Sequence, residues 1–256
     1  MASRLQVWLN RMILRRAQAR WSANAARVPE MRLRELRGVK ALAQQTRFAL
    51  DRLVLEASYR LEKPGRAETR RRLPGTDWHW RPDLWRGPLA QPGLVVTEGR
   101  SQLAEGATLF HDCIDPEICL RQLRNTGEAD GAPCALRLEV FRFDGSFLSL
   151  VLDLPESAAE GLKLRHLIRV EAQIDSDRPR PVYARLNIRH GPNVEQIPRQ
   201  LELTGDYMSV DFDMAYSGVN EKRIEKLWID LIFGDPEMSQ ITLRDLTVSR
   251  RPRAEL

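Results

Sequence analysis

Polar and apolar residues alternate along several short segments after residue 73. The period of two is clear in residues 166–174 and recurs in residues 182–188, 208–214 and 227–233. The apolar side of the first segment carries His166, Ile168, Val170, Ala172 and Ile174. Successive side chains of a strand point to opposite faces, so each segment predicts a strand with one face in a core. At least seven such segments, separated by Gly, Pro, Asn and Asp, predict an antiparallel β-sandwich.

Two local patterns refine this expectation. Residues 136–140 and 148–154 flank Asp144-Gly145, and Asp-Gly between two alternating runs predicts a β-hairpin. In the last segment, residues 241 and 243 keep one phase and residues 246 and 248 keep the other. This change of phase predicts a β-bulge near residues 244–245. A bulged last strand and seven or more strands favour a jelly roll, whose strand order the periodicity leaves open.

The first 63 residues follow a helical period instead. Apolar residues at 5, 8, 9, 12 and 13 predict an amphipathic helix, and a second helix is expected after Pro29, ending at Pro64-Gly65. The second helix carries a weak coiled-coil seam formed by Leu36, Val39, Ala43, Thr46, Leu50, Leu53 and Ala57. We therefore predict a partner helix or a homo-oligomer through residues 29–63.

Charge separates the same two regions. Residues 1–72 carry 18 Lys and Arg against 6 Asp and Glu, a net charge of +12, whereas residues 73–256 carry 22 against 29, a net charge of −7. We interpret residues 1–72 as a basic helical arm and residues 73–256 as the β-sandwich domain. Because the arm has no base-reading motif, nucleic acid is not expected as a partner.

The first helix also matches a membrane-binding pattern. Trp8 and Trp21 would lie at a lipid interface while Arg11 and Arg15 meet anionic headgroups, which predicts an anionic membrane surface as a partner of residues 1–28. The alternative is that the apolar side of this helix packs on the second helix or on the sandwich.

Targeting signals are weak. The amino terminus lacks the continuous apolar stretch of a secretory signal, no segment approaches the length of a membrane span, and three cysteines suit a reducing compartment. These features predict a cytoplasmic protein, peripheral to the inner membrane if the arm binds lipid. An Arg-rich start without acidic residues also fits a mitochondrial transit peptide.

Four stretches resemble a known family: residues 76–85 (TDWHWRPDLW), 141–147 (FRFDGSF), 186–193 (LNIRHGPN) and 241–247 (ITLRDLT). They are similar to an uncharacterised family of Rhodobacter-like alphaproteobacterial proteins, which carries no function to transfer. More distantly, the last strand resembles galactose-binding-like jelly rolls and carbohydrate-binding modules, which often present a sheet face to a glycan. This second resemblance is one of fold, and a fold alone does not establish function.

The polar sides of three predicted strands form the candidate ligand-binding surface. It comprises Tyr183, Arg185, Asn187, Arg189, Asp211, Asp213, Trp228 and Asp230. Aromatic rings cover the C–H faces of sugars, while guanidinium, amide and carboxylate groups bond their hydroxyls, so this mixture favours a glycan. The alternatives are a protein ligand and a solvated face held by cross-strand ion pairs.

Other candidate sites have plainer interpretations. The cluster Trp78, Trp80 and Trp85 would stack a ligand or, more simply, lock the entry segment onto the sandwich. A zinc site of His111, Cys113, Cys119 and Cys134 lacks a CxxC ligand pair, and Asp175-Ser176-Asp177 lacks the other ligands of a calcium loop. We therefore expect no metal and no cofactor.

No catalytic motif stands out. The sequence contains no nucleophile elbow, phosphate loop, dinucleotide fingerprint or metalloprotease helix. A pair of carboxylates such as Asp211 and Asp230 would suit a glycoside hydrolase. We predict a non-catalytic binding module, with a structural or assembly protein as the alternative and a hydrolase as a lesser one.

Overall fold

The computed structural model describes residues 4–62, 73–89, 91–127 and 130–253. Contacts between residues divide the chain into two units, residues 1–53 and 54–256. This division falls inside a long helix, so the boundary that the charge pattern places after residue 72 stays a prediction.

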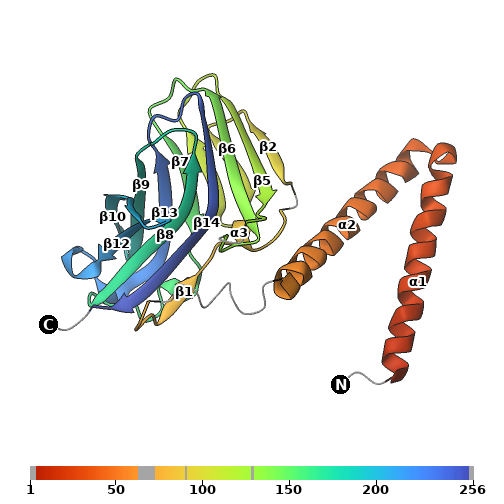
Figure 1. Cartoon of the computed structure of the whole chain (residues 1–256), viewed down its shortest axis with the longest axis horizontal. Coiled ribbons are helices and arrows are strands. Elements are labelled where there is room, and N and C mark those ends of the chain that lie inside the picture. Colours follow the sequence, from red (N-terminus) through yellow and green to blue (C-terminus); the bar gives the residue numbers. More distant parts are fainter. Residues whose placement is uncertain (1–3, 63–72, 90, 128–129, 254–256) are drawn as a thin grey trace. The chain divides into compact units, whose positions relative to one another are not determined.

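The amino-terminal part consists of two helices (Figure 1). They are α1 (Arg4–Arg27) and α2 (Leu33–Glu62), separated by the 3-10 turn η1 (Val28–Glu30), which has Pro29 near its start. Both predicted helices are confirmed, although the predicted stop at Pro64-Gly65 lies outside the described residues. Among the described helices, none is long and apolar enough to cross a membrane.

The rest of the chain forms two antiparallel sheets (Figure 1). The eight-stranded sheet comprises β1 (Trp78–Trp80), β2 (Gly93–Val96), β5 (Glu117–Arg124), β6 (Cys134–Arg142), β8 (His166–Ser176), β11 (Glu202–Thr204), β12 (Tyr207–Asp213) and β14 (Ser239–Pro252). Its order is β11-β12-β8-β14-β6-β5-β2, and β1 also pairs with β14.

The six-stranded sheet comprises β3 (Arg100–Ala104), β4 (Ala107–His111), β7 (Leu148–Asp153), β9 (Val182–His190), β10 (Asn193–Gln200) and β13 (Ile224–Phe233). Its order is β10-β9-β13-β7-β4-β3. Four short helical turns lie between strands: α3 (Asp83–Arg86), η2 (Glu156–Ala158), η3 (Met214–Tyr216) and η4 (Glu221–Arg223). The predicted fold class, an antiparallel β-sandwich after an α-helical segment, is confirmed.

The inward faces of the two sheets form one hydrophobic core. In β8 the buried side is Ile168, Val170 and Ala172, as the alternation predicts, and it faces Leu186, Ile229 and similar residues of the other sheet. Aliphatic side chains of this size each stabilise the fold by about 1.5–3 kcal/mol when fully buried. The outward faces of both sheets and the loops at their ends are therefore the surfaces that remain open to partners.

The predicted hairpin at Asp144-Gly145 is wrong. Strand β6 belongs to the eight-stranded sheet and β7 to the six-stranded sheet, so the loop between them crosses from one sheet to the other. A two-residue type I′ hairpin turn needs positive φ at both central residues, and neither Asp144 nor Gly145 has it. Asp144 instead accepts hydrogen bonds from the β4–β5 loop, at Cys113 and Ile114.

The predicted bulge in the last strand is confirmed. The register of β14 against β8 shifts between Leu243 and Asp245, which leaves Arg244 as the extra residue. The bulge moves the Asp245 side chain to a buried position, where its carboxylate pairs with Arg81.

Candidate functional site

The six-stranded sheet brings six of the eight predicted ligand-binding residues together. Tyr183, Arg185, Asn187 and Arg189 alternate with core residues along β9, so they lie on its outer side. Trp228 and Asp230 lie on the outer side of the neighbouring strand β13. The prediction that Asp211 and Asp213 belong to the same surface is wrong, because β12 is part of the eight-stranded sheet.

Strand register arranges these side chains in rows. Asn187 lies opposite Trp228, Arg185 opposite Asp230, and Tyr183 opposite Ile232. Strand β7 continues the rows, since Ile232 lies opposite Ser149 and Asp230 opposite Val151. Side chains directly opposite one another on one face have Cβ atoms about 4.5–5.5 Å apart, so the rows form one continuous surface. We call the set Tyr183, Arg185, Asn187, Trp228, Asp230 and Ser149 the binding face.

Three polar side chains of the binding face are buried although the face points outward. Asn187 is 0%, Asp230 2% and Ser149 5% exposed. Each of these side chains has one buried oxygen without a hydrogen-bond partner among the described residues. These oxygens are Asn187 Oδ1, Asp230 Oδ1 and Ser149 Oγ. A buried polar atom without a partner costs about 1–3 kcal/mol. Three such oxygens therefore lie on three adjacent strands of one sheet.

The other polar atoms of the face are occupied. The Asp230 carboxylate binds Arg185 through Oδ2, at 2.7 Å from Nε and 2.6 Å from Nη2. The Asn187 amide nitrogen donates to the carbonyl oxygens of Arg185 at 3.1 Å and Trp228 at 3.4 Å. These contacts fix both side chains, so that their oxygens without partners are held in place rather than free to rotate away.

Three cations around this face have a carboxylate partner, whereas Arg100 on β3 lies 5.7 Å from the centroid of the Phe110 ring. Besides Arg185 with Asp230, Lys226 Nζ lies 2.7 Å from Asp153 Oδ1 and Arg189 Nε lies 3.0 Å from Glu225 Oε2. The face is therefore polar but close to electrically neutral.

Aromatic rings border the buried oxygens. The Trp228 ring is partly exposed, with Lys226 Nζ 6.0 Å from its centroid, and Tyr183 is exposed. Phe110 on β4 lies opposite Ser149. Rings beside hydrogen-bonding oxygens can hold a ligand that has both C–H faces and hydroxyl groups.

Ser149 is the member of this surface that the sequence prediction missed. It follows Leu148 and precedes Leu150 within a run of apolar residues, so its polarity is the one available signal. The parity of β7 places it on the outer side, but only the sheet order shows that β7 lies next to β13.

The family comparison covers the whole chain, residues 1–256. The protein belongs to DUF6478, a family of unknown function. A search of curated protein sequences gives no match. The alphaproteobacterial origin stays a prediction.

Solved structures similar to this DUF6478 member include carbohydrate-binding modules. The family 11 module of a cellulosomal cellulase from Clostridium thermocellum is 9% identical with a TM-score of 0.38, covering 63% of this chain and 99% of that chain. The xylan-binding CBM22-1 domain from Paenibacillus barcinonensis is 8% identical with a TM-score of 0.36, covering 57% and 87%. The tailspike protein 4 of bacteriophage CBA120 is 8% identical with a TM-score of 0.38, and the match spans 60% of this chain but only 21% of the tailspike chain.

Asp211 and Asp213, on the eight-stranded sheet, are paired with arginines. Asp211 accepts from Arg169 at 3.5 Å and Arg251 at 3.3 Å, and Asp213 pairs with Arg253 at 3.3 Å. Asp211 and Asp230 lie on the outer faces of opposite sheets, so they cannot flank one glycosidic bond. The pair Asp211 and Asp230 therefore does not support the alternative that the protein is a glycoside hydrolase.

The tryptophan cluster locks the entry segment onto the sandwich. Trp85 is fully buried, and its indole nitrogen donates to the Leu243 carbonyl at 2.9 Å. Trp78 donates to Ser157 at 3.1 Å, and Trp80 packs partly buried against the core. This packing agrees with the interpretation that the three tryptophans hold the entry segment in place, rather than stack a ligand.

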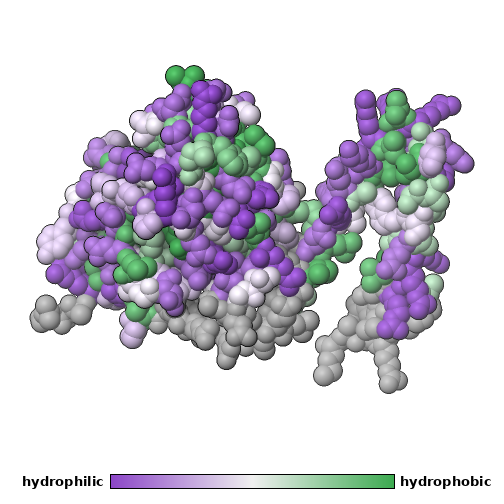
Figure 2. Space-filling view, turned by 45° about the horizontal axis from the view of Figure 1, so that its top comes forward, coloured by the Kyte–Doolittle hydropathy of each residue, from purple (hydrophilic) through white to green (hydrophobic). Residues whose placement is uncertain are grey.

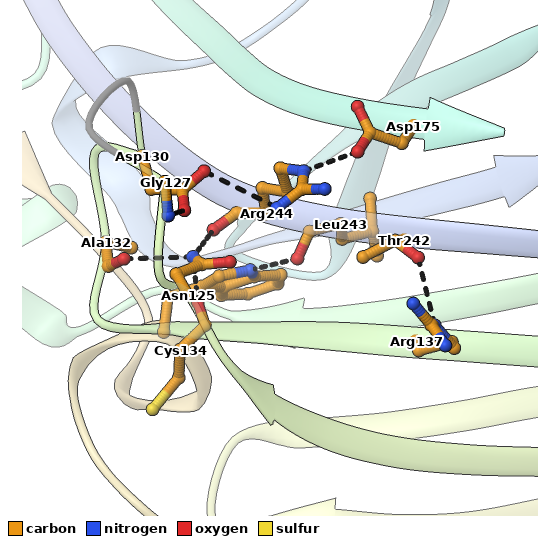
Figure 3. Close-up of polar contacts among 11 residues, drawn as sticks. Asn125, Gly127, Asp130, Ala132, Cys134, Arg137, Asp175, Thr242, Leu243 and Arg244 are labelled. Carbon is orange, nitrogen blue, oxygen red and sulfur yellow. Dashed lines mark hydrogen bonds and ion pairs between the residues drawn. The ribbon is translucent and has the colours of Figure 1, made fainter.

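The candidate calcium residue Asp175 is bound by a cation of the chain. Figure 3 shows Arg244, the bulge residue, between Asp175 and Asp130, with Asn125 donating to the Arg244 carbonyl at 2.8 Å. Within the described ranges, no group of three or more His, Cys, Asp and Glu is placed to hold a metal ion. The three cysteines are free, and burial raises the pKa of Cys134 to about 11.

The predicted membrane-facing residues lie on α1. Arg11 and Arg15 are exposed and Trp21 is partly exposed, whereas the Trp8 side chain lies outside the described part of the chain. Their role stays a prediction.

Proposed function

We propose that the protein is a non-catalytic binding module whose binding face recognises a glycan. The observation that carries the proposal is the group of three buried oxygens without partners, on β7, β9 and β13, beside Trp228 and Tyr183. Sugar hydroxyls can donate to an amide oxygen, a carboxylate oxygen and a serine hydroxyl. An aromatic ring beside them would cover the C–H face of the sugar.

The charge balance of the face favours a neutral saccharide. An acidic sugar would need a free cation, yet Arg185, Arg189 and Lys226 each lie within 3.0 Å of a carboxylate oxygen. Breaking such a pair leaves the carboxylate near the incoming acid group and repels it. The hydroxyl groups of a neutral sugar can donate hydrogen bonds to the unpartnered oxygens of the binding face without breaking any of these ion pairs.

The test is a glycan array followed by calorimetric titration of the full chain. Wild type should bind neutral oligosaccharides, and Trp228→Ala should weaken binding by about 10- to 100-fold through loss of ring contact. Phe141→Ala is the matched control, since Phe141 is an exposed ring on the eight-stranded sheet. Absence of binding across diverse saccharides, or equal binding by Trp228→Ala, would contradict the proposal.

For the arm we propose attachment of the module to an anionic membrane surface. The exposed Arg11 and Arg15 and the partly exposed Trp21 support this role, which would place a cytoplasmic protein at the inner membrane. Flotation with anionic and neutral vesicles tests it. The full chain should float with anionic vesicles alone, and substitution of Arg11 and Arg15 by Gln should reduce flotation; no flotation of the wild type would end the idea.

A second candidate is an assembly protein that oligomerises through residues 29–63. Exposed apolar residues of α2 favour it, namely Leu42, Leu50, Leu53 and Val54, and Figure 2 shows hydrophobic residues at the surface of both helices. Light scattering of wild type and of Leu50→Ser/Leu53→Ser would distinguish the cases. A monomeric wild type would count against this function.

A further inference from the structure

Two loops at one end of the sandwich brace each other through carboxylates. One loop joins β4 to β5 and the other joins β6 to β7. Asp112 of the first accepts from the backbone N–H groups of Ser146 at 2.7 Å and Phe147 at 3.1 Å. Asp144 of the second accepts from the Ile114 N–H at 3.0 Å and from the Cys113 thiol at 2.7 Å. The exchange of hydrogen bonds in both directions fixes the two loops against one another.

The bracing carboxylates stay charged. The Ser146 hydroxyl, and then the Phe147 N–H, lower the pKa of Asp112, and the Cys113 thiol, and then the Ile114 N–H, lower the pKa of Asp144. Close packing adds rigidity, because a Cβ on Gly145 would lie 2.7 Å from the Cys113 backbone nitrogen. The loops therefore form a pre-ordered surface.

This surface displays large apolar side chains to solvent. Ile114 is 91% exposed and Phe147 is 42% exposed, and Phe141 at the end of β6 is also exposed. Exposed apolar groups held in a fixed arrangement are typical of interaction sites. We call Asp112, Ile114, Asp115, Asp144 and Phe147 the acidic tip.

The tip is strongly acidic. Asp112, Asp115 and Asp144 are all exposed, and Glu117 lies beside them in sequence. In the described part of these loops and strand ends, Arg142 is the one cation, and it is bound to Asp115 at 2.6 Å. An anionic membrane would be repelled, so the partner must combine apolar side chains with positive charge.

Helix α1 has that composition. It contains no Asp or Glu, and the first acidic residue of the chain is Glu30. Its described side chains include the exposed Ile13 and Leu14, next to exposed arginines at 11, 15 and 16. Apolar residues flanked by arginines match an apolar tip flanked by carboxylates.

We propose that the acidic tip of one chain binds α1 of a second copy of the chain. Ile13 and Leu14 would cover Ile114 and Phe147, and arginines of α1 would meet Asp112, Asp115 and Asp144. The contact differs from α2 pairing in its residues and in its dependence on salt, because charges of opposite sign attract less as salt screens them. It also does not depend on the glycan proposal.

Analytical ultracentrifugation of the full chain at about 50 mM and 500 mM salt tests the proposal. Wild type should self-associate at low salt and dissociate at high salt. Ile114→Ser/Phe147→Ser should weaken association by about tenfold or more. Tyr216→Ser, at another exposed ring, should leave it unchanged.

A charge-reversal experiment tests the same contact without the Ile114→Ser/Phe147→Ser variant, in case that variant does not fold. A fluorescent peptide of residues 4–27 should bind the full chain, and Asp115→Lys should weaken that binding about tenfold. The same peptide with Arg15→Glu and Arg16→Glu should bind Asp115→Lys better than it binds wild type. A monomeric wild type at all concentrations would overturn the proposal, and so would association that Leu50→Ser/Leu53→Ser abolishes while the tip variants retain it.

Discussion

The outer faces of the two sheets use polar residues in different ways. On the eight-stranded sheet, Asp211 and Asp213 are bound by arginines, and Arg169 also reaches Glu171 at 3.6 Å. Two buried atoms of that face, Gln173 Oε1 and Arg169 Nε, have no hydrogen-bond partner among the described residues. On the six-stranded sheet, three buried oxygens of the binding face lack partners among the described residues and lie beside the exposed Tyr183 ring and the partly exposed Trp228 ring. The two faces therefore differ in how far their polar side chains pair within the chain, and this difference is what the proposed binding face rests on.

The largest expected effect concerns the eight-stranded sheet. Asp245→Ala removes the partner of the buried Arg81, which it holds through two bonds of 2.8 and 2.9 Å, and should lower the free energy of unfolding by about 3–5 kcal/mol. Asp211→Ala, at a more exposed arginine pair, should cost less than about 1 kcal/mol. Urea unfolding measures both, and equal losses would show that burial does not distinguish the two pairs.

The next effect is on ligand choice at the six-stranded sheet. Asp230→Asn frees the Arg185 guanidinium while it keeps the shape of the side chain. We expect weaker binding of neutral saccharides and about tenfold stronger binding of acidic ones, because the cation is no longer neutralised. Calorimetric titration with matched neutral and uronic acid oligosaccharides measures the change. Asp211→Asn is the control, and an unchanged preference in Asp230→Asn would contradict the neutral-face interpretation.

A smaller effect separates stability from binding. Ser149→Ala removes a buried hydroxyl that has no partner in the described structure, so stability should stay the same or rise by up to about 1 kcal/mol. Glycan binding should weaken by about tenfold if Ser149 bonds a ligand hydroxyl. Thermal unfolding and titration of one preparation give both values. A marked loss of stability would mean that Ser149 is a structural residue.

The smallest effect is a pH dependence on the eight-stranded sheet. Burial lowers the pKa of His166 below its usual value of 6.5, against the opposing effect of Asp77. The unfolded chain therefore binds more protons, so this contribution to stability is full above about pH 6.5 and declines as pH falls toward the folded pKa. Melting temperatures at pH 7.5 and 5.5 should differ in wild type. His166→Asn should flatten the difference, and an equal slope in both would exclude His166 as its source.

Much of the fold follows from period-two patterns, whereas the pairing of strands does not. The alternation in β8 and the change of phase at Arg244 predict a strand and a bulge, because each depends on neighbours in sequence. The hairpin prediction at Asp144-Gly145 is wrong because Asp112 and Cys113 of another loop bond to this turn, and residues so far apart in sequence leave no local pattern.

The candidate site has the same limit. Parity within β9 and β13 assigns Tyr183, Asn187 and Trp228 to outward faces, and sheet order then places the strands side by side. Asp211 has the correct parity but lies on the other sheet, which no spacing in sequence can show. The burial of Ser149 beside Phe110 likewise depends on the pairing of β7 with β4.

The most direct test of the binding face is a nuclear magnetic resonance titration of the full chain with a neutral oligosaccharide selected on the array. The six tryptophans give indole N–H signals that can be assigned by single substitutions. The Trp228 indole and the Asn187 side-chain amide should shift with the ligand, while the buried Trp85 indole should stay unchanged. Shifts confined to Trp78 and Trp80, with Trp228 and Asn187 unaffected at saturation, would place the ligand elsewhere and contradict the assignment of the face.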